Sequence, residues 1–111
     1  MALLIPESEQ FARFINSDRS AIQVHATIIL GNIGASHPEQ NERYATALAK
    51  SVKDLDAEVR TAAALSLGKL PCKESIKMLK HLQDDSDSKV RQRANAALEN
   101  IQSPSEHSLT E

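Results

Sequence analysis

The stretch Asp54-Leu-Asp-Ala-Glu-Val-Arg-Thr-Ala-Ala-Ala-Leu-Ser-Leu-Gly-Lys-Leu70 returns 31 residues later as Asp85-Ser-Asp-Ser-Lys-Val-Arg-Gln-Arg-Ala-Asn-Ala-Ala-Leu-Glu-Asn-Ile101. Both copies carry an Asp-x-Asp turn, a Val-Arg pair and apolar residues at shared positions. In the first copy the apolar residues from Val59 to Leu70 recur every three or four residues, which places them on one face of an α-helix. One such helix cannot cover its own apolar face, so the repeat predicts a stack of similar units.

A third, weaker copy occupies residues 17–33 and begins 37 residues before Asp54. It keeps the apolar positions; Ile22, for example, stands where Val59 stands in the stronger copy. It loses the polar signature, and such departures suit a capping repeat at the end of a stack. The residues that replace the two aspartates and the arginine are Ser17, Arg19 and Gln23.

A shorter apolar helical pattern precedes each copy, over residues 7–16, 41–53 and 73–83. The sequence therefore predicts an all-α solenoid of three helix pairs, six helices in all, in one domain over residues 1–102. A longer polar connection follows the first pair, where Gly31 and Gly34 are expected to end the helix. Residues 103–111 are rich in Ser and Glu and are predicted to form a disordered tail. The expected repeats span about residues 7–34, 41–70 and 73–102.

The composition agrees with a helical fold. Ala and Leu are abundant, and the chain has only two Phe, one Tyr and no Trp. Its 111 residues suffice for one domain with a core of its own. The net charge is −2 with acids and bases interspersed, so no basic surface for nucleic acid is expected.

Nothing in the sequence indicates export or membrane insertion. A single cysteine cannot form an internal disulfide, so no oxidising compartment is required. The apolar start, Met1–Ile5, lacks a basic region and is too short for a signal peptide or a span. A cytoplasmic location without a membrane partner is therefore expected.

The Asp-x-Asp turn, followed by Val-Arg, Ala-Ala and Leu-Gly pairs, resembles the second-helix signature of HEAT repeats. It is closest to the short subclass named after phycobilisome lyases, and the resemblance covers about residues 7–102. Asp54–Leu70 matches almost throughout, Asp85–Ile101 has Glu99 in place of the glycine, and residues 17–33 match in apolar positions only. The resemblance implies stacked pairs of helices A and B, with the B helices on the concave side. The subclass includes lyase subunits that attach bilins to phycobiliproteins, and many adaptors.

The resemblance also implies a ladder between repeats, in which each aspartate caps its own helix and each arginine reaches a neighbouring repeat. The cap follows from the sequence as well, because an aspartate directly before a helix accepts from its free backbone N–H groups. The alternative is a metal site formed by Asp54, Asp56, Asp85 and Asp87, but capping and stacking explain all four, so no metal is expected. The expected ladder residues are Asp56, Arg60, Asp87 and Arg91.

Other candidates for chemistry are scattered along the chain. The four histidines lack the spacing of a two-histidine helix site, so ordinary solvated or partly packed side chains are expected. Cys72 lies near Lys69 and Lys73, which favour a thiolate, but no histidine or acid is placed beside it, so an inert thiol is favoured. We find no nucleophile elbow or phosphate loop, so neither catalysis nor a cofactor is expected. The histidines are His25, His37, His81 and His107.

Two columns of positions on the B helices are more apolar than solubility requires. Read across the three repeats, they are Ile28, Leu65 and Ala96, and Val24, Thr61 and Gln92. Residues four apart share a helix face, and equal positions of adjacent repeats lie side by side, so one patch on the concave side is predicted. We expect a protein partner to bind this patch; the alternative is packing against the stack or the apolar N-terminus. The predicted partner-binding residues are Val24, Ile28, Thr61, Leu65 and Gln92.

These observations favour a non-enzymatic interaction module, a scaffold or adaptor that holds a partner protein on its B-helix face. Two alternatives stay open. The resemblance allows a lyase-like factor that binds a bilin or a phycobiliprotein, although the chain is shorter than the lyase subunits it resembles. The other alternative is a small solenoid that associates with itself through its exposed ends.

Overall fold

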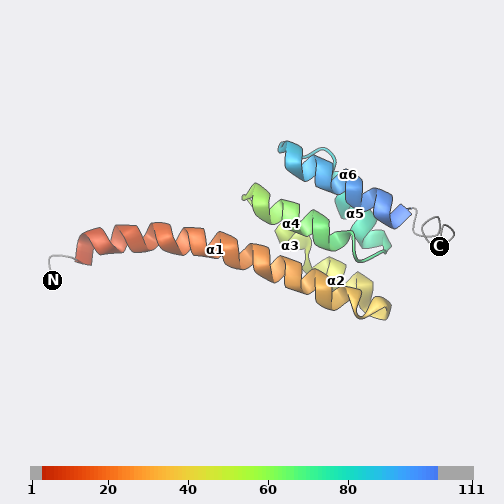
Figure 1. Cartoon of the computed structure of the whole chain (residues 1–111), viewed down its shortest axis with the longest axis horizontal. Helices are drawn as coiled ribbons and strands as arrows, with labels where there is room; N and C mark the ends of the chain where they lie inside the picture. Colours follow the sequence, from red (N-terminus) through yellow and green to blue (C-terminus); the bar gives the residue numbers. More distant parts are fainter. Residues whose placement is uncertain (1–3, 103–111) are drawn as a thin grey trace.

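The computed structural model describes the backbone of residues 4–102 and the side chains of residues 19–102. Every regular element in this range is helical (Figure 1). The predicted all-helical fold is therefore confirmed for these residues, and the predicted tail over residues 103–111 lies outside them. In chain order the elements are α1 (Leu4–Ala35), the 3₁₀ helix η1 (Pro38–Gln40), α2 (Asn41–Ala47), α3 (Ala49–Val52), α4 (Ala57–Leu67), α5 (Lys73–Leu82) and α6 (Ser88–Gln102).

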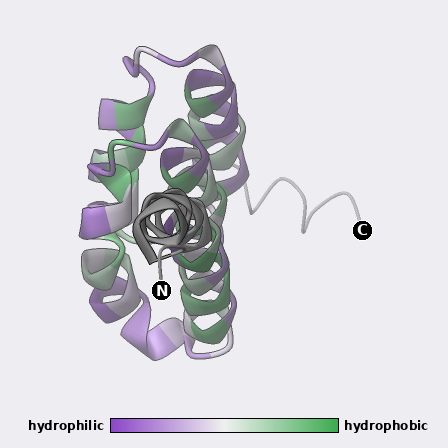
Figure 2. Ribbon diagram, turned by 90° about the vertical axis from the view of Figure 1, so that its left-hand side faces the viewer, coloured by the Kyte–Doolittle hydropathy of each residue, from purple (hydrophilic) through white to green (hydrophobic). Residues whose placement is uncertain are grey.

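The helices form two layers, as Figure 2 shows from the side. The three B helices, α1, α4 and α6, lie side by side, with α4 in contact with both of the others. The A helices form the second layer, in which the consecutive α2 and α3 pack on α5. Each later B helix also packs on its own A helix, α4 on α3 and α6 on α5. This is the stacking expected of a solenoid.

The two strong copies begin as the sequence predicts. The Asp56 carboxylate accepts from the backbone N–H of Glu58 at 2.9 Å, so Asp56 is the N-cap of α4. The Asp87 carboxylate accepts from the backbone N–H groups of Lys89 at 2.8 Å and Val90 at 3.2 Å, so Asp87 caps α6 in the same way. These bonds satisfy backbone donors that have no partner inside the helix.

The first repeat differs from the prediction, because helix α1 runs without a break from Leu4 to Ala35. The expected turn near residue 17, between separate helices over 7–16 and 17–33, is wrong. In the second repeat the turn is held by a bond from the Asp56 N–H to the Asp54 carboxylate, at 2.9 Å. Ser17 and Arg19 stand at these positions in the first repeat, and no Pro or Gly lies between residues 7 and 30 to stop the helix.

The helix predicted over residues 41–53 is split in two at Leu48. The N–H of Leu48 donates both to the carbonyl of Tyr44 at 3.1 Å and to the carbonyl of Ala45 at 3.0 Å. The second bond spans three residues and marks a local 3₁₀-type turn. The Leu48 side chain is fully buried between the layers, so the tightened turn still contributes to the core.

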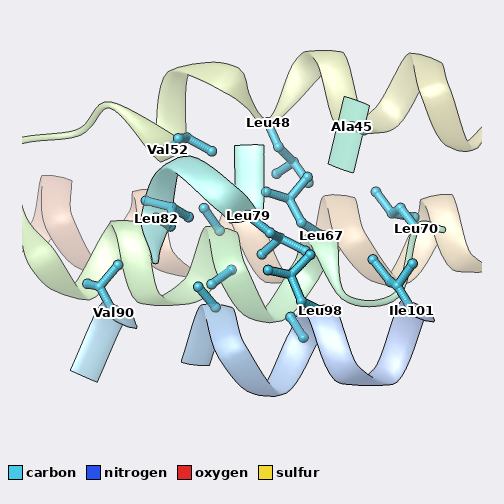
Figure 3. Packing of buried hydrophobic residues seen from close by; sticks show 14 residues of the cluster. Ala45, Leu48, Val52, Leu67, Leu70, Leu79, Leu82, Val90, Leu98 and Ile101 are labelled. Carbon is cyan, nitrogen blue, oxygen red and sulfur yellow. The ribbon is translucent and has the colours of Figure 1, made fainter. Parts of the chain in front are cut away.

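One continuous core lies between the two layers (Figure 3). Both layers contribute: leucines from α4 and the turn after it meet leucines from α5 and from the α2–α3 junction. Burying a leucine stabilises the fold by about 2 kcal/mol, so these side chains outweigh any single polar contact. The fully buried leucines are Leu48, Leu67, Leu70, Leu79 and Leu82.

Gly31 and Gly34 do not end the first B helix as expected, since both lie inside α1. They allow close packing instead. A Cβ added at Gly31 would meet the side chain of Ser66 and lie 2.9 Å from its Cα, so α1 and α4 cross almost in backbone contact. At Gly68 an added Cβ would lie 2.9 Å from the Cβ of Ala97, on α6. Small residues therefore set the spacing of all three B helices.

We predict that Gly31→Ala destabilises the protein by about 1–3 kcal/mol, because α1 and α4 must move apart to admit the methyl group. In an uncrowded helix the same change stabilises by roughly 1 kcal/mol, so the sign of the effect is diagnostic. Urea unfolding measures it. Ala21→Gly, at an exposed position of the same helix, calibrates the helix-propensity part. A more stable Gly31→Ala protein would contradict the close crossing.

Candidate functional site

The five predicted partner-binding residues line one groove across the B-helix layer. Val24 and Ile28 come from α1, Thr61 and Leu65 from α4, and Gln92 from α6. The groove has a volume of about 700 Å³. On α4 its residues lie on the side opposite the buried core face, so the groove opens away from the A helices.

Four residues outside the predicted set also line the groove: Glu58, Ala62, Lys89 and Arg93. Each stands three residues before a position in the two columns of the patch, as Glu58 stands before Thr61. Residues three apart share a helix face, so this signal was present in the sequence. Ala96, the third member of one column, also lines the groove.

The groove combines an apolar floor with charged edges. Leu65 is 38% exposed and lies on the central helix, while Val24 and Ile28 are half-buried. The Thr61 hydroxyl donates to the backbone carbonyl of Ala57 at 2.8 Å, so it is already satisfied and adds little polarity. Such a floor favours burial of an apolar side chain from outside.

The charges of the groove are distributed unevenly. Two bases, Lys89 and Arg93, come from α6, and one acid, Glu58, comes from α4. The α1 wall, Val24 and Ile28, carries no charge. An approaching ligand therefore meets an apolar wall on one side and a basic wall on the other.

A second hollow of about 290 Å³ continues the groove between α4 and α6. It shares Leu65, Arg93 and Ala96 with the first and extends to Gly68 and Asn100. At this end of the hollow the Asn100 side chain donates to the Gly68 carbonyl at 3.3 Å. The groove is thus long enough to follow two helices for more than one turn.

The ladder residue Arg60 joins the second repeat to the third. Its Nε and Nη2 donate to the two carboxylate oxygens of Asp85, at 2.9 and 3.1 Å. Its Nη1 donates to the carbonyls of Asp54 and Leu55 in its own turn, at 2.8 and 3.0 Å. One guanidinium therefore fixes two successive turns, as the planar fork of arginine allows.

Arg91 makes a different contact, since no further repeat follows it within residues 4–102. Its Nη1 donates instead to the carbonyl of Asp85 in its own turn, at 2.7 Å. The aspartates of the ladder serve as caps: Asp56 and Asp87 cap α4 and α6, whereas the partner of Arg60 is Asp85. Capping and pairing thus belong to different aspartates of each Asp-x-Asp turn.

The first repeat has Gln23 in place of the arginine and reaches the second repeat differently. Ser20 on α1 hydrogen-bonds to the Asp56 carboxylate, and this bond is the largest cause of a lowered pKa for Asp56. The bond from the N–H of Glu58 lowers this pKa further. In the interior, the Ser66 hydroxyl donates to the Thr27 carbonyl at 2.8 Å, and the hydroxyls of Thr27 and Ser51 lie 2.7 Å apart.

The charge pair of the ladder is largely shielded from water, with 15% of the Arg60 side chain and 10% of the Asp85 side chain exposed. Burial is the largest single influence and raises the pKa of the Asp85 carboxyl, but the hydrogen bonds from Arg60 and from the N–H of Asp87, together with electrostatic attraction to Arg60 and His81, outweigh it. The pKa of Asp85 therefore lies below its usual value. The bond to Asp85 likewise raises the pKa of Arg60.

The other candidates for chemistry do not converge. Within the part of the chain that the structure describes, no three His, Cys, Asp or Glu side chains are close enough to hold a metal ion. His25 and His81 are exposed, and His37 contacts the carbonyl of Ile33 through Nδ1 at 2.9 Å. The Cys72 sulfur lies 3.4 Å from the Ser75 hydroxyl at the start of α5. His107 lies outside the described residues.

The stacked helix pairs, the inter-repeat arginine and the groove across the B helices define an α-solenoid repeat protein. A family model described as HEAT repeats matches residues 9–99. The chain belongs to this family. No curated protein matches the chain significantly. None of the helices within the described residues is long and apolar enough to cross a membrane.

We predict that Arg60→Ala lowers the free energy of unfolding by about 2 kcal/mol, because it leaves Asp85 partly buried without its partner. Lys77→Ala, at an exposed position of α5, should change stability by less than about 0.5 kcal/mol. Urea unfolding at neutral pH compares the two variants. Equal midpoints would contradict the ladder.

The same pair predicts an acid dependence of stability. The Asp85 pKa is lowered on folding, so the stabilisation is present above the unfolded value of about 3.9 and is lost as the pH falls through the folded value. Asp85→Asn removes this titration. The melting temperatures of the two proteins should differ most near neutral pH and approach each other as the pH falls below about 3.9. A constant difference at every pH would show that Asp85 does not titrate as proposed.

Proposed function

We propose that this protein is a non-enzymatic interaction module that holds a partner protein in the groove between α1, α4 and α6. HEAT repeats commonly mediate contacts between proteins, and the chain belongs to that family. The observation that carries the proposal is the meeting of Val24, Ile28, Thr61 and Leu65 on one open, mostly apolar surface. The A helices and the core support this surface from behind, so a partner would meet a preformed site.

The lining of the groove favours a segment that carries both an apolar and an acidic side chain. An apolar anchor would fill the floor around Leu65, where burial displaces water from half-exposed aliphatic groups. An acidic residue one helical turn away would lie near Lys89 and Arg93 on the α6 side. An amphipathic helix with one apolar and one acidic face meets both conditions.

We predict that Leu65→Asp weakens partner binding by about thirtyfold or more, because a buried apolar anchor commonly contributes at least 2 kcal/mol. Leu65 is partly exposed and outside the core, so the melting temperature should change little. Affinity capture from the native host lysate identifies the partner, and titration calorimetry with that partner measures the loss.

Leu55→Asp is the matched control, since Leu55 is 99% exposed in the turn before α4 and does not line the groove. It should bind like the unmodified protein. Arg93→Glu adds a charge test, and it should weaken an acidic partner while leaving an uncharged one unaffected. Unchanged binding by a folded Leu65→Asp protein would place the site elsewhere, and loss of folding would assign Leu65 to the packing.

The assignment to the phycobilisome-lyase type of HEAT repeat is our proposal and rests on the Asp-x-Asp, Val-Arg and Leu-Gly pattern. It supports a second candidate function, binding of a bilin or a phycobiliprotein. Incubation with a linear tetrapyrrole followed by absorbance of the repurified protein tests this candidate. A retained visible band would favour it over the peptide-binding groove. A cytoplasmic location and the lack of catalysis are parts of the same proposal.

A further inference from the structure

A stripe of isoleucines on α1 faces solvent. Ile22, Ile29 and Ile33 are 62%, 56% and 42% exposed, and Ala26 between them is also exposed. Their spacings of four, three and four residues place all four on one side of the helix. We call these four residues the α1 stripe. It lies away from Val24 and Ile28, which line the groove, and away from Thr27 and Gly31, which meet α4.

The same four positions are buried in both later repeats. In α4 and the turn after it they are Val59, Ala63, Ser66 and Leu70, and in α6 they are Val90, Ala94, Ala97 and Ile101. None of these eight side chains is more than 8% exposed. Each later B helix is covered there by its own A helix and by the preceding B helix, since α4 contacts α3 and α1, and α6 contacts α5 and α4.

The first repeat lacks this cover because its A segment continues α1 in a straight line. The N-terminal half of α1 extends away from the other helices in Figure 1. In the sequence the spacing of the stripe continues toward the N-terminus to Ile15 and Phe11, seven and eleven residues before Ile22. A straight helix cannot fold back on itself, so residues 7–16 do not reach the stripe of their own chain.

We propose that a second copy of this chain covers the α1 stripe. The two α1 helices run antiparallel about a twofold axis that crosses their stripe faces at the level of residue 20. Residues 7–16 of each copy lie on the stripe of the other, with Phe11 beside the partner's Ile29. This exchanges the A segment of the first repeat between two chains, and exchange of an identical element is a low-cost route to a dimer.

Within the described part of the chain, the opposite end of the stack, formed by α5 and α6, lacks exposed large hydrophobic side chains, and this favours a twofold pair over end-to-end stacking. Among the described residues, the exposed large hydrophobic side chains are Ile22, Ile29, Ile33, Leu55 and Leu65, and none lies on α5 or α6. A head-to-tail contact would set the stripe against polar side chains. In a twofold contact the apolar surface of one copy packs on the same surface of the other, and the assembly is complete with two copies. It also leaves the groove open, because the groove occupies another side of α1.

The first test is the mass of the full chain by light scattering over a concentration series. We expect twice the 12.2 kDa of one chain, falling to one chain on dilution. The double substitution Ile22→Asp and Ile29→Asp should raise the dissociation constant by about thirtyfold or more, as loss of buried anchors does. Leu55→Asp, equally apolar and more exposed but outside the stripe, should leave it unchanged. A single-chain mass at every concentration would overturn the proposal.

Disulfide trapping gives the arrangement of the two chains. In a Cys72→Ser background, a chain with Phe11→Cys is mixed with a chain with Ile29→Cys and oxidised. We expect a disulfide between the two different chains. A bond that forms only within one chain carrying both substitutions, at the mass of one chain, would mean that residues 7–16 fold back and would overturn the exchange. The groove substitution Leu65→Asp should leave the dimer mass unchanged, so failure of the partner site and failure of the dimer are distinguishable.

Discussion

Helix α4 lies between α1 and α6, and it can approach both closely only because the residues at the two crossings are small. Gly31 meets Ser66 on one side, and Gly68 meets Ala97 on the other. This close spacing lets the Ser66 hydroxyl reach a carbonyl of α1. A larger side chain at either crossing would separate the B helices and open the core behind them.

The polar contact between the second and third repeats depends on the same close packing. Arg60 can join its own turn to Asp85 only because adjacent repeats are held at a fixed distance, since a bidentate contact tolerates little displacement. The groove depends on it too, because its walls come from three helices that are far apart in the sequence. A surface built on packed helices is rigid, and rigidity lowers the cost of binding a partner.

The two ends of the stack are unequal. The outer surface of α6 is mostly polar and is suited to contact with water. The opposite end presents the α1 stripe, which has the pattern of an internal repeat rather than of a cap. A large apolar surface of this kind is a place for association, and the continuous α1 helix supplies a segment with a matching pattern.

Three features could be predicted from the sequence alone: the helical class, the starts of α4 and α6 at Asp56 and Asp87, and the residues of the groove floor. These features depend on local hydrogen bonds and on helical periodicity, and both signals occur in each of the two strong copies of the repeat. The charged edges of the groove could also have been predicted from the sequence, because Glu58 and Lys89 lie one helical turn from predicted positions.

Three other features became known only from the packing of the helices. The first is the pairing of Arg60 with Asp85. The placement of adjacent turns decides which of two neighbouring aspartates faces the arginine. The second is the assignment of Gly31 to a helix crossing, since a glycine that ends a helix and one that admits a neighbour look alike in sequence. The third is the continuation of α1 through residue 17, where local propensity allows a helix and only packing could have imposed a turn.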